Sequence, residues 1–264
     1  MHIIIRAASM VVATVGLIAL TGIMMKSAIE NTASTTFDTS SNGFAVVELF
    51  TSQGCSSCPS ADRFLSELLQ ESEAESKELY ALSFHVDYWD RLGWKDPYSR
   101  KAFTDRQRAY AQALGTSQVY TPQMVINGQE AFVGSQRNQG RSLVKQALQE
   151  TPIAKIESLS LIVKDSELMI IAQSPIVDND VMFNIALVER DIDTEVKRGE
   201  NSGRTLHHDN VVRVFRSIEM TSGGQTETSI TVPQNLDRSK AAIIVFIQEK
   251  ASMKILTAKS AALK

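Results

Sequence analysis

The sequence predicts an α/β domain followed by an all-β domain. Three observations lead to this prediction. An apolar run at residues 44–50 reads as a buried strand, and a short polar loop joins it to an amphipathic helix that begins near Pro59. Strand and helix patterns then alternate up to residue 150. Beyond residue 153 the helical periodicity disappears, and short β-rich runs separated by turn signals take its place.

The N-terminus has the pattern of an export signal or a membrane anchor. A basic opening that includes Arg6 precedes an uncharged, largely apolar run at residues 7–25. This run is long for the core of a signal peptide and just long enough to span a bilayer. The positive charge favours a cytoplasmic N-terminus and a periplasmic location for the rest of the chain. We therefore expect residues 1–28 to be a signal peptide or an inner-membrane anchor.

Two outcomes stay open for this segment, namely cleavage near Ala28 or Ala33 and retention as an anchor through residues 7–25. Residues 29–43 are rich in Ser and Thr and are expected to form a flexible tether. The full sequence has the composition of a soluble protein, with 43% hydrophobic and 22% charged residues. A net charge of −3 gives no electrostatic reason to propose nucleic acid as a partner.

The only two cysteines form a Cys-x-x-Cys motif, Cys55 to Cys58, at the junction of the first strand and the helix. The N-terminus of a helix favours a thiolate, which is the attacking species in disulfide exchange. Export agrees with this motif because disulfides persist mainly in oxidising compartments. We expect Cys55 to be the exposed nucleophile and Cys58 the resolving thiol. Pro59 suits the first helical turn because its missing N–H would be unpaired there anyway.

A zinc site and an inert disulfide are the alternatives for this motif. Structural zinc would need two further Cys or His ligands at close spacing. The sequence has no second Cys pair, and its four histidines are not spaced in that way; they are His2, His85, His207 and His208. We therefore predict a redox pair, with no metal and no cofactor.

The middle of the first domain predicts a strand at residues 79–87, a loop at 88–97 and a helix at 98–114. The loop holds both tryptophans, Trp89 and Trp94, which pack as a lid or form a contact surface beside the cysteines. One face of the helix carries basic side chains, which we expect to be solvated; they are Arg100, Lys101, Arg106 and Arg108.

A hairpin and a helix close the first domain. Asn127-Gly128 is a hairpin signal that joins residues 124–126 to 131–133. Residues 141–148 then carry apolar side chains on one helical face.

The second half contains seven short β-rich runs in about 110 residues. They are 156–163, 168–172, 181–188, 211–218, 226–232, 242–247 and 255–257. This number and spacing predict a β-sandwich, immunoglobulin-like in outline, over residues 153–264. The segment 197–209 is an unusual loop rich in charged residues, including Arg198, Glu200, Arg204, His207 and His208. We expect this loop to dock against the first domain or its partner, and we expect the adjacent histidines to point to opposite faces.

The motifs ELFTSQGCSSCP, HVDYWD and VYTPQMVING resemble those of an uncharacterised bacterial family of exported thioredoxin-like proteins. The similarity covers residues 46–133 and extends weakly to the RGEN and GRTL motifs at 198–206. It implies a thioredoxin-like fold for residues 44–150 and a redox role. The chain departs from thioredoxin at Ser56-Ser57, which stand where thioredoxin has Gly-Pro, and in its second domain. These differences leave the redox potential and the direction of electron flow open.

The resemblance also implies roles for individual residues. Thr121-Pro122 resembles the cis-proline segment that lies against the cysteines of thioredoxin-like proteins and binds an extended substrate. Thioredoxins carry a buried acid in the strand that enters the motif, and Glu48 lies near that position. Glu48 is either such a proton shuttle or a residue that faces water on the other side of the strand.

Three functions remain open at this stage. The first is an exported thiol–disulfide oxidoreductase, in which Cys55 attacks a protein partner, Cys58 resolves the mixed disulfide, and Trp89, Trp94, Thr121 and Pro122 bind the partner. The second is a copper(I)-handling module that adds Met124 or His85 to the two thiolates, although a buried, hydrogen-bonded core role suits His85 better. The third is a tethered binding protein in which the disulfide stabilises the turn. The sequence does not give the oligomeric state.

Overall fold

The computed structural model describes residues 43–175, 180–220 and 224–263, which belong to the compact unit formed by residues 39–264. These residues form a mixed α/β fold that consists mostly of strands and contains three α-helices. No helix among them is long and apolar enough to cross a membrane. The predicted signal or anchor at 1–28 and the tether up to residue 42 lie outside the described residues.

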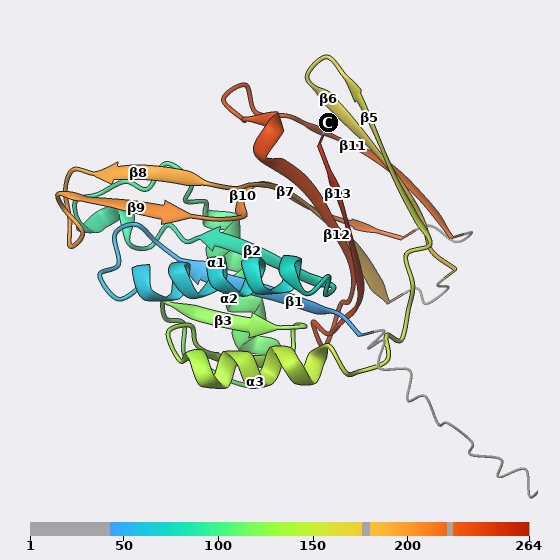
Figure 1. Ribbon diagram of the computed structural model, residues 1–264, viewed down its shortest axis with the longest axis horizontal. Coiled ribbons are helices and arrows are strands. Elements are labelled where there is room, and N and C mark those ends of the chain that lie inside the picture. Colours follow the sequence, from blue (N-terminus) through green and yellow to red (C-terminus); the bar gives the residue numbers. More distant parts are fainter. Residues whose placement is uncertain (1–42, 176–179, 221–223, 264) are drawn as a thin grey trace, which may run out of the picture. The chain divides into compact units, whose positions relative to one another are not determined.

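The first half follows the order that the sequence predicts: strand, helix, strand, helix, hairpin and helix (Figure 1). Its elements are β1 (Ala45–Thr51), α1 (Pro59–Ala74), β2 (Leu79–His85), the 3₁₀ turn η1 (Asp90–Leu92), α2 (Lys101–Ala113), β3 (Gln123–Ile126), β4 (Glu130–Val133) and α3 (Arg137–Ala147). The predicted hairpin turn is present, and Asn127 and Gly128 both adopt a positive φ there.

The second half contains all seven predicted strands and two more. Its elements are β5 (Ser158–Lys164), β6 (Glu167–Gln173), β7 (Val181–Glu189), β8 (Ile192–Val196), β9 (Arg204–His208), β10 (Val211–Glu219), β11 (Gln225–Thr231), the 3₁₀ turn η2 (Arg238–Lys240), β12 (Ala241–Glu249) and β13 (Ile255–Ala262). The two unpredicted strands, β8 and β9, pair with each other. All of β9 therefore lies within the segment 197–209 that the sequence predicts to be a loop.

One eight-stranded sheet runs through both halves in the order β13-β12-β7-β10-β2-β1-β3-β4. β1 is parallel to β2 and antiparallel to β3. The halves join where Val211 of β10 pairs with Ser83 of β2. Asn210 reinforces this join, because its carbonyl accepts from the Ser83 N–H at 2.9 Å and its side-chain amide donates to the Ala81 carbonyl at 2.8 Å. The boundary predicted at residues 150–153 thus separates two halves that share a sheet; independent folding of each half stays a prediction.

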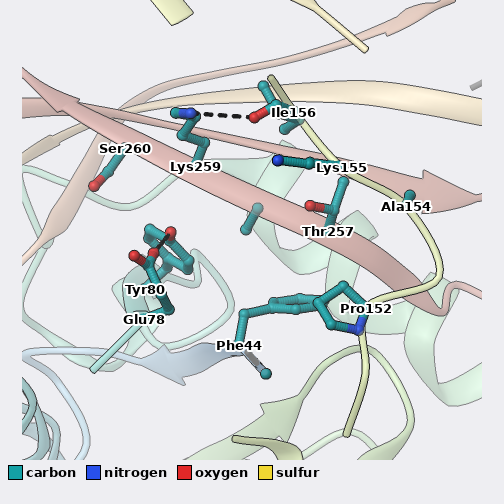
Figure 2. A pocket seen from close by; sticks show the side chains of 12 residues that line it. Phe44, Glu78, Tyr80, Pro152, Ala154, Lys155, Ile156, Thr257, Lys259 and Ser260 are labelled. Carbon is teal, nitrogen blue, oxygen red and sulfur yellow. Dashed lines mark hydrogen bonds between the residues drawn. The ribbon is translucent and has the colours of Figure 1, made fainter. Parts of the chain in front are cut away.

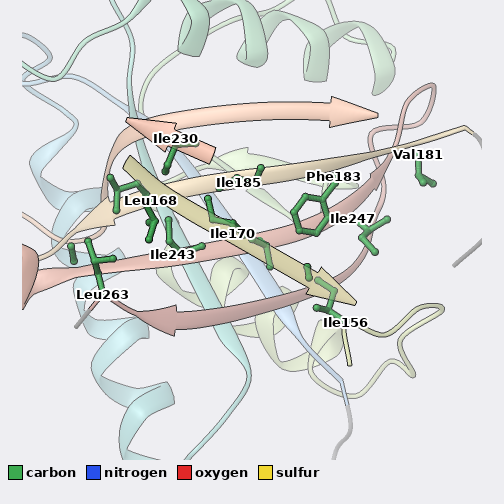
Figure 3. Packing of buried hydrophobic residues seen from close by; sticks show 14 of the residues in the cluster. Ile156, Leu168, Ile170, Val181, Phe183, Ile185, Ile230, Ile243, Ile247 and Leu263 are labelled. Atoms are coloured by element: carbon green, nitrogen blue, oxygen red, sulfur yellow. The ribbon is translucent and has the colours of Figure 1, made fainter. Parts of the chain in front are cut away.

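The middle strands of the second half are buried on both faces. Phe183, Ile185 and Leu187 of β7 face a separate three-stranded sheet, β11-β6-β5, and Figure 3 shows Phe183 and Ile185 among the apolar side chains in this core. Ala186 and Val188 point the other way, into a second core that includes α2. Each large apolar side chain buried in this way contributes roughly 1.5–3 kcal/mol to the free energy of folding.

β1 separates two cores in the first half and so positions the cysteine motif. Val47 and Leu49 pack on the side of α1 and α3. Val46 and Phe50, which alternate with them, pack on the side of α2. A strand presents successive side chains to opposite faces, which explains this division. Both cores thus hold β1 in place, and the cysteine loop begins where β1 ends.

Candidate functional site

The two cysteines form a disulfide between the end of β1 and the start of α1. The loop is shaped by backbone turns in which the Cys55 N–H donates to the Ser52 carbonyl at 3.1 Å and the Cys58 N–H donates to the Cys55 carbonyl at 3.2 Å. Cys58 is the N-cap of α1, and Pro59 is its first helical residue. The predicted succession of strand, polar loop, Cys-x-x-Cys and helix is therefore confirmed.

Both cysteines are fully buried, so the expectation of an exposed Cys55 is wrong in this structure. The physical reason is a cover from the second half of the chain. The Asn201 side-chain amide donates to the Gln53 carbonyl at 3.0 Å and to the Cys55 carbonyl at 2.9 Å. The Glu200 carboxylate accepts the Ser56 N–H at 3.0 Å. The prediction that this loop docks against the first half is confirmed at these two residues.

The turn between β8 and β9 holds Glu200 and Asn201 in place. Arg204 donates to the side-chain oxygen of Asn201 at 2.8 Å, which orients the amide nitrogen toward the cysteine loop. Gly199 adopts a φ of +78°, and a Cβ there would lie 3.2 Å from the Cβ of Trp94. We call residues 199–203, between the two positive-φ glycines Gly199 and Gly203, the cover loop.

The two tryptophans lie beside the cysteine loop, which is where the contact-surface interpretation of this region places them. The Trp94 indole N–H donates to the side-chain oxygen of Gln53 at 3.0 Å. The Trp89 indole N–H donates to the Thr121 hydroxyl at 2.8 Å. Trp89 also packs on Gly54, where an added Cβ would lie 3.3 Å from the Trp89 Cβ. Trp89 therefore links the cysteine loop to the Thr121 segment.

The Thr121–Pro122 peptide bond is cis, as the resemblance implies. The Pro122 carbonyl accepts the Gly134 N–H at 2.9 Å, which ties this segment to the end of β4. Of the predicted site residues, Trp94 and Trp89 thus contact the disulfide loop, Thr121 is joined to it through Trp89, and Pro122 follows Thr121 in the chain. Their role in binding a partner stays a prediction.

Glu48 is buried, but it lies apart from the cysteines. Its carboxylate accepts two hydrogen bonds from Arg106, at 2.6 and 2.8 Å, and one from the Tyr110 hydroxyl. Both partners belong to α2, whereas the cysteine helix α1 packs on the opposite face of β1. Among the described residues, no hydrogen bond or ion pair joins Glu48 to Cys55 or Cys58. Its predicted catalytic role therefore has no contact to support it.

Arg106 departs from the solvated basic face that the sequence predicts for α2. Its guanidinium is buried beside Glu48 and lies over the rings of Phe84, Tyr110, Phe215 and Phe246. Burial disfavours the cation, but the Glu48 carboxylate outweighs this cost and raises the pKa of Arg106. Arg106, Glu48 and Tyr110 thus form a closed network, which we call the α2 cluster.

A second buried polar group lies near the cysteine loop, and the sequence predicts only part of it. Nδ1 of His85, at the end of β2, is 2.7 Å from the Asp96 carboxylate. The same carboxylate oxygen accepts the N–H of Gln53, two residues before Cys55, at 2.9 Å. Burial opposes the charged form of His85, yet Asp96 outweighs it and raises the pKa of His85. The hydrogen-bonded core role predicted for His85 is confirmed, and Asp96 was not predicted.

His208 and Asp62 complete this group. The rings of His208 and His85 meet edge to face, with centroids 4.8 Å apart. Nδ1 of His208 lies 3.6 Å from a carboxylate oxygen of Asp62, on α1. His207 is half-exposed and pairs with Asp193 and Asp209, so the adjacent histidines do point to opposite faces. We call Asp62, His208, His85 and Asp96 the α1 cluster.

The α1 cluster is incompletely satisfied. Within the described part of the chain, both carboxylate oxygens of Asp62, both ring nitrogens of His208 and Nε2 of His85 are buried without a hydrogen-bond partner. The same part contains no group of three or more His, Cys, Asp or Glu side chains arranged to hold a metal ion. Met124, the other ligand considered for copper, packs in the apolar core beneath α1.

Residues 46–248 match the family model described as "Protein of unknown function (DUF1223)". The chain belongs to this family. In this DUF1223 chain, the match begins in β1, ends in β12 and includes the disulfide, both clusters and the cover loop. No curated protein matches the sequence.

The DUF1223 chain is similar to the crystal structure of protein AGR_C_4864 from Agrobacterium tumefaciens, with 28% identity and a TM-score of 0.64 over 83% of this chain and 94% of that one. Two further structures give low TM-scores and support no inference. A domain of the outer membrane lipoprotein Omp28 from Porphyromonas gingivalis has 11% identity and a TM-score of 0.26, over 43% of this chain and 91% of that one. OgpA from Akkermansia muciniphila has 10% identity and a TM-score of 0.29, over 76% of this chain and 72% of that one.

A cavity of about 610 Å³ in this DUF1223 chain lies away from the disulfide. Figure 2 shows Phe44, which precedes β1, and Tyr80 of β2 lining it opposite Thr257 and Lys259 of β13. The cysteine loop follows the other end of β1, and seven extended residues span roughly 20 Å. The ammonium group of Lys259 donates hydrogen bonds to the backbone carbonyls of Ile156 and Glu157. We therefore place the candidate site at the disulfide.

Proposed function

We propose that this protein is an exported thiol–disulfide oxidoreductase that exchanges the Cys55–Cys58 disulfide with a protein partner. The observation that carries the proposal is the disulfide itself, which closes a loop at the N-terminus of α1. Backbone N–H groups and the positive end of the helix dipole stabilise a thiolate at such a position. A stabilised thiolate is both a good leaving group and a ready nucleophile in exchange.

The arrangement of the first half supports the proposal. The order β1-α1-β2-α2-β3-β4-α3, with β3 antiparallel to β1, resembles a thioredoxin-like domain. The Thr121–Pro122 bond is cis, as the resemblance implies, and Trp89 joins the Thr121 hydroxyl to the disulfide loop. In the second half, β11-β6-β5 packs on β7 and β12 around one core, as the two sheets of a β-sandwich do. On this proposal the β-rich half presents or selects the protein partner.

The proposed exchange has two steps and needs no cofactor. In the reduced protein, the Cys55 thiolate attacks a disulfide of the partner, so that a mixed disulfide forms and one partner sulfur leaves with the electron pair. The Cys58 thiolate then attacks Cys55, which restores the Cys55–Cys58 bond and releases the second partner thiolate. The partner is reduced by two electrons and the cysteine pair is oxidised by two. The reverse sequence oxidises a dithiol partner.

The complete burial of both cysteines favours one other function, in which the protein binds a partner and the disulfide only stabilises the turn. The two functions differ in what the cover loop must do. Exchange requires Glu200 and Asn201 to leave the cysteine loop, whereas a structural disulfide does not.

Trapping of a mixed disulfide in the producing cell tests the proposal. In Cys58→Ser the resolving thiol is absent, so we expect the full chain to accumulate in partner adducts that thiol reductants release. Cys55→Ser is the matched control, because it keeps one cysteine but lacks the proposed nucleophile, and it should give no adduct. Absence of adducts in both variants would contradict exchange with a protein. Fractionation of the same cells tests export, since a periplasmic location is expected for both variants.

A further inference from the structure

Cys58 has an acidic neighbour on its own helix. Cys58 has α-helical backbone angles, and its carbonyl accepts the N–H of Asp62 at 3.1 Å. Side chains four residues apart on a helix share a face, with about 5–6 Å between their Cβ atoms. The side chain of Asp62 is only 4% exposed, so its carboxylate faces the protein interior. Cys58 and Asp62 therefore lie on the same face of α1, and both are buried.

The carboxylate of Asp62 has an unusual set of contacts for a buried acid. Among the described residues, neither oxygen has a hydrogen-bond partner, and its nearest basic group is Nδ1 of His208 at 3.6 Å. An ionised carboxylate normally accepts several hydrogen bonds when it is buried, because the loss of solvation is costly. A buried group that lacks such bonds has capacity to accept a proton.

We propose that Asp62, held by His208, accepts the proton of the Cys58 thiol when Cys58 resolves a mixed disulfide, and returns it when the pair is reduced. This inference rests on the proposed function and deepens it by naming a proton acceptor. In the resolving step the Cys58 S–H bond breaks and the proton passes to the Asp62–His208 pair. The electron pair left on Cys58 forms the bond to Cys55, and the partner thiolate leaves with the electrons of the broken S–S bond.

The charged groups around the pair belong to four segments. His85 on β2 packs against His208, and Asp96 in the loop before α2 binds His85. Arg100, at the N-cap of α2, acts on His85 through its charge. Asp209 accepts from the Asp191 N–H and interacts with His207. The carboxylates of Asp62 and Asp96 thus flank the two stacked imidazoles of His208 and His85.

The resolving step can be measured with glutathione as the probe. The reduced full chain is mixed with oxidised glutathione, samples are quenched with acid at set times, and intact mass gives the fraction of the Cys55–glutathione adduct. We expect Asp62→Asn to slow the decay of this adduct roughly 10- to 100-fold at pH 6.5, because general-base assistance is lost. The difference should shrink toward pH 9, where a thiol with an ordinary pKa near 8.5 ionises without help.

Two variants keep the test decisive. Asp105→Asn makes the same chemical change on the exposed face of α2, where Asp105 pairs with Lys101 and Arg108, and it should resolve the adduct like the wild type. His208→Asn should slow the decay of the glutathione adduct by a smaller factor and with the same pH dependence. This variant therefore tests the inference even if Asp62→Asn fails to fold. Wild-type decay rates in both Asp62→Asn and His208→Asn would overturn this inference alone. A wild-type protein that forms no adduct and whose cysteine pair stays reduced in oxidised glutathione would overturn the proposed function as well.

Discussion

The two buried charge clusters on either side of β1 differ in how completely they are paired. In the α2 cluster, Glu48 accepts two hydrogen bonds from Arg106 and one from Tyr110, and four aromatic rings surround the guanidinium. In the α1 cluster, Nδ1 of His208 lies 3.6 Å from a carboxylate oxygen of Asp62, and neither atom has a hydrogen-bond partner among the described residues. Full pairing compensates the loss of solvation and fixes a structure, whereas partial pairing leaves buried polar atoms whose loss of solvation is not compensated. Only the partly paired cluster lies beside the disulfide.

The largest effect that the comparison predicts is the loss of stability in Glu48→Ala. Removal of one partner leaves Arg106 buried as an uncompensated charge, and we expect the free energy of unfolding to fall by about 3–5 kcal/mol. Urea denaturation followed by circular dichroism measures this loss. The exposed Asp105→Asn change serves as the control and should have little effect. A Glu48→Ala protein as stable as the wild type would break the distinction between the two clusters.

The comparison also predicts that His85 makes the stability of the fold depend on pH, with a smaller effect than the loss expected in Glu48→Ala. The pKa of His85 is raised in the folded state, because Asp96 outweighs the effect of burial, so its contribution is complete below the unfolded value near 6.5 and is lost as pH rises through the folded value. Burial would raise the pKa of Asp96, but His85 and two backbone N–H groups lower it. The contribution of Asp96 is therefore present above about pH 4 and is lost as pH falls through its folded value.

The pair thus stabilises the fold most between about pH 4 and 6.5. His85→Gln should remove about 1.5–3 kcal/mol in this window and progressively less above it, because a hydrogen bond to a charged group is lost. The pKa of His207 is also raised, so His207→Gln is run in parallel. Its effect should be smaller because its ring is 42% exposed. The midpoint of urea unfolding is measured for each protein from pH 4 to 9. A loss of stability in His85→Gln that is the same at every pH would contradict a charged His85 paired with an ionised Asp96.

The sequence predicts well the features that depend on local pattern. The β1 strand, the cysteine helix, the hairpin at Asn127-Gly128 and all seven β-rich runs are present. Local pattern does not show which strands pair at long range, so the join of β10 to β2 could not be predicted; it depends on Asn210 binding a carbonyl 129 residues earlier in the chain. The burial of Arg106 was missed for a similar reason, because its partner Glu48 is 58 residues away.

The candidate site was predicted at the residues that carry a motif. The two tryptophans lie beside the cysteine loop and Trp89 joins Thr121 to it. Glu200 and Asn201 dock on the same loop. Asp62 and Asp96 carry no motif, because a single acid in a helix or loop is usually solvated. One signal for Asp62 was available: it lies one turn after Cys58, on the face of α1 next to the apolar residues Ala61, Leu65 and Leu69.

The midpoint potential of the Cys55–Cys58 pair tests the central claim most directly. The full chain is equilibrated in glutathione buffers of graded potential, free thiols are alkylated after acid quenching, and intact mass gives the oxidised fraction. A working exchanger should have a midpoint within roughly −120 to −270 mV, and its position in that range would indicate whether the protein oxidises or reduces its partner. A pair that stays oxidised well below about −300 mV would contradict the claim and identify the disulfide as structural.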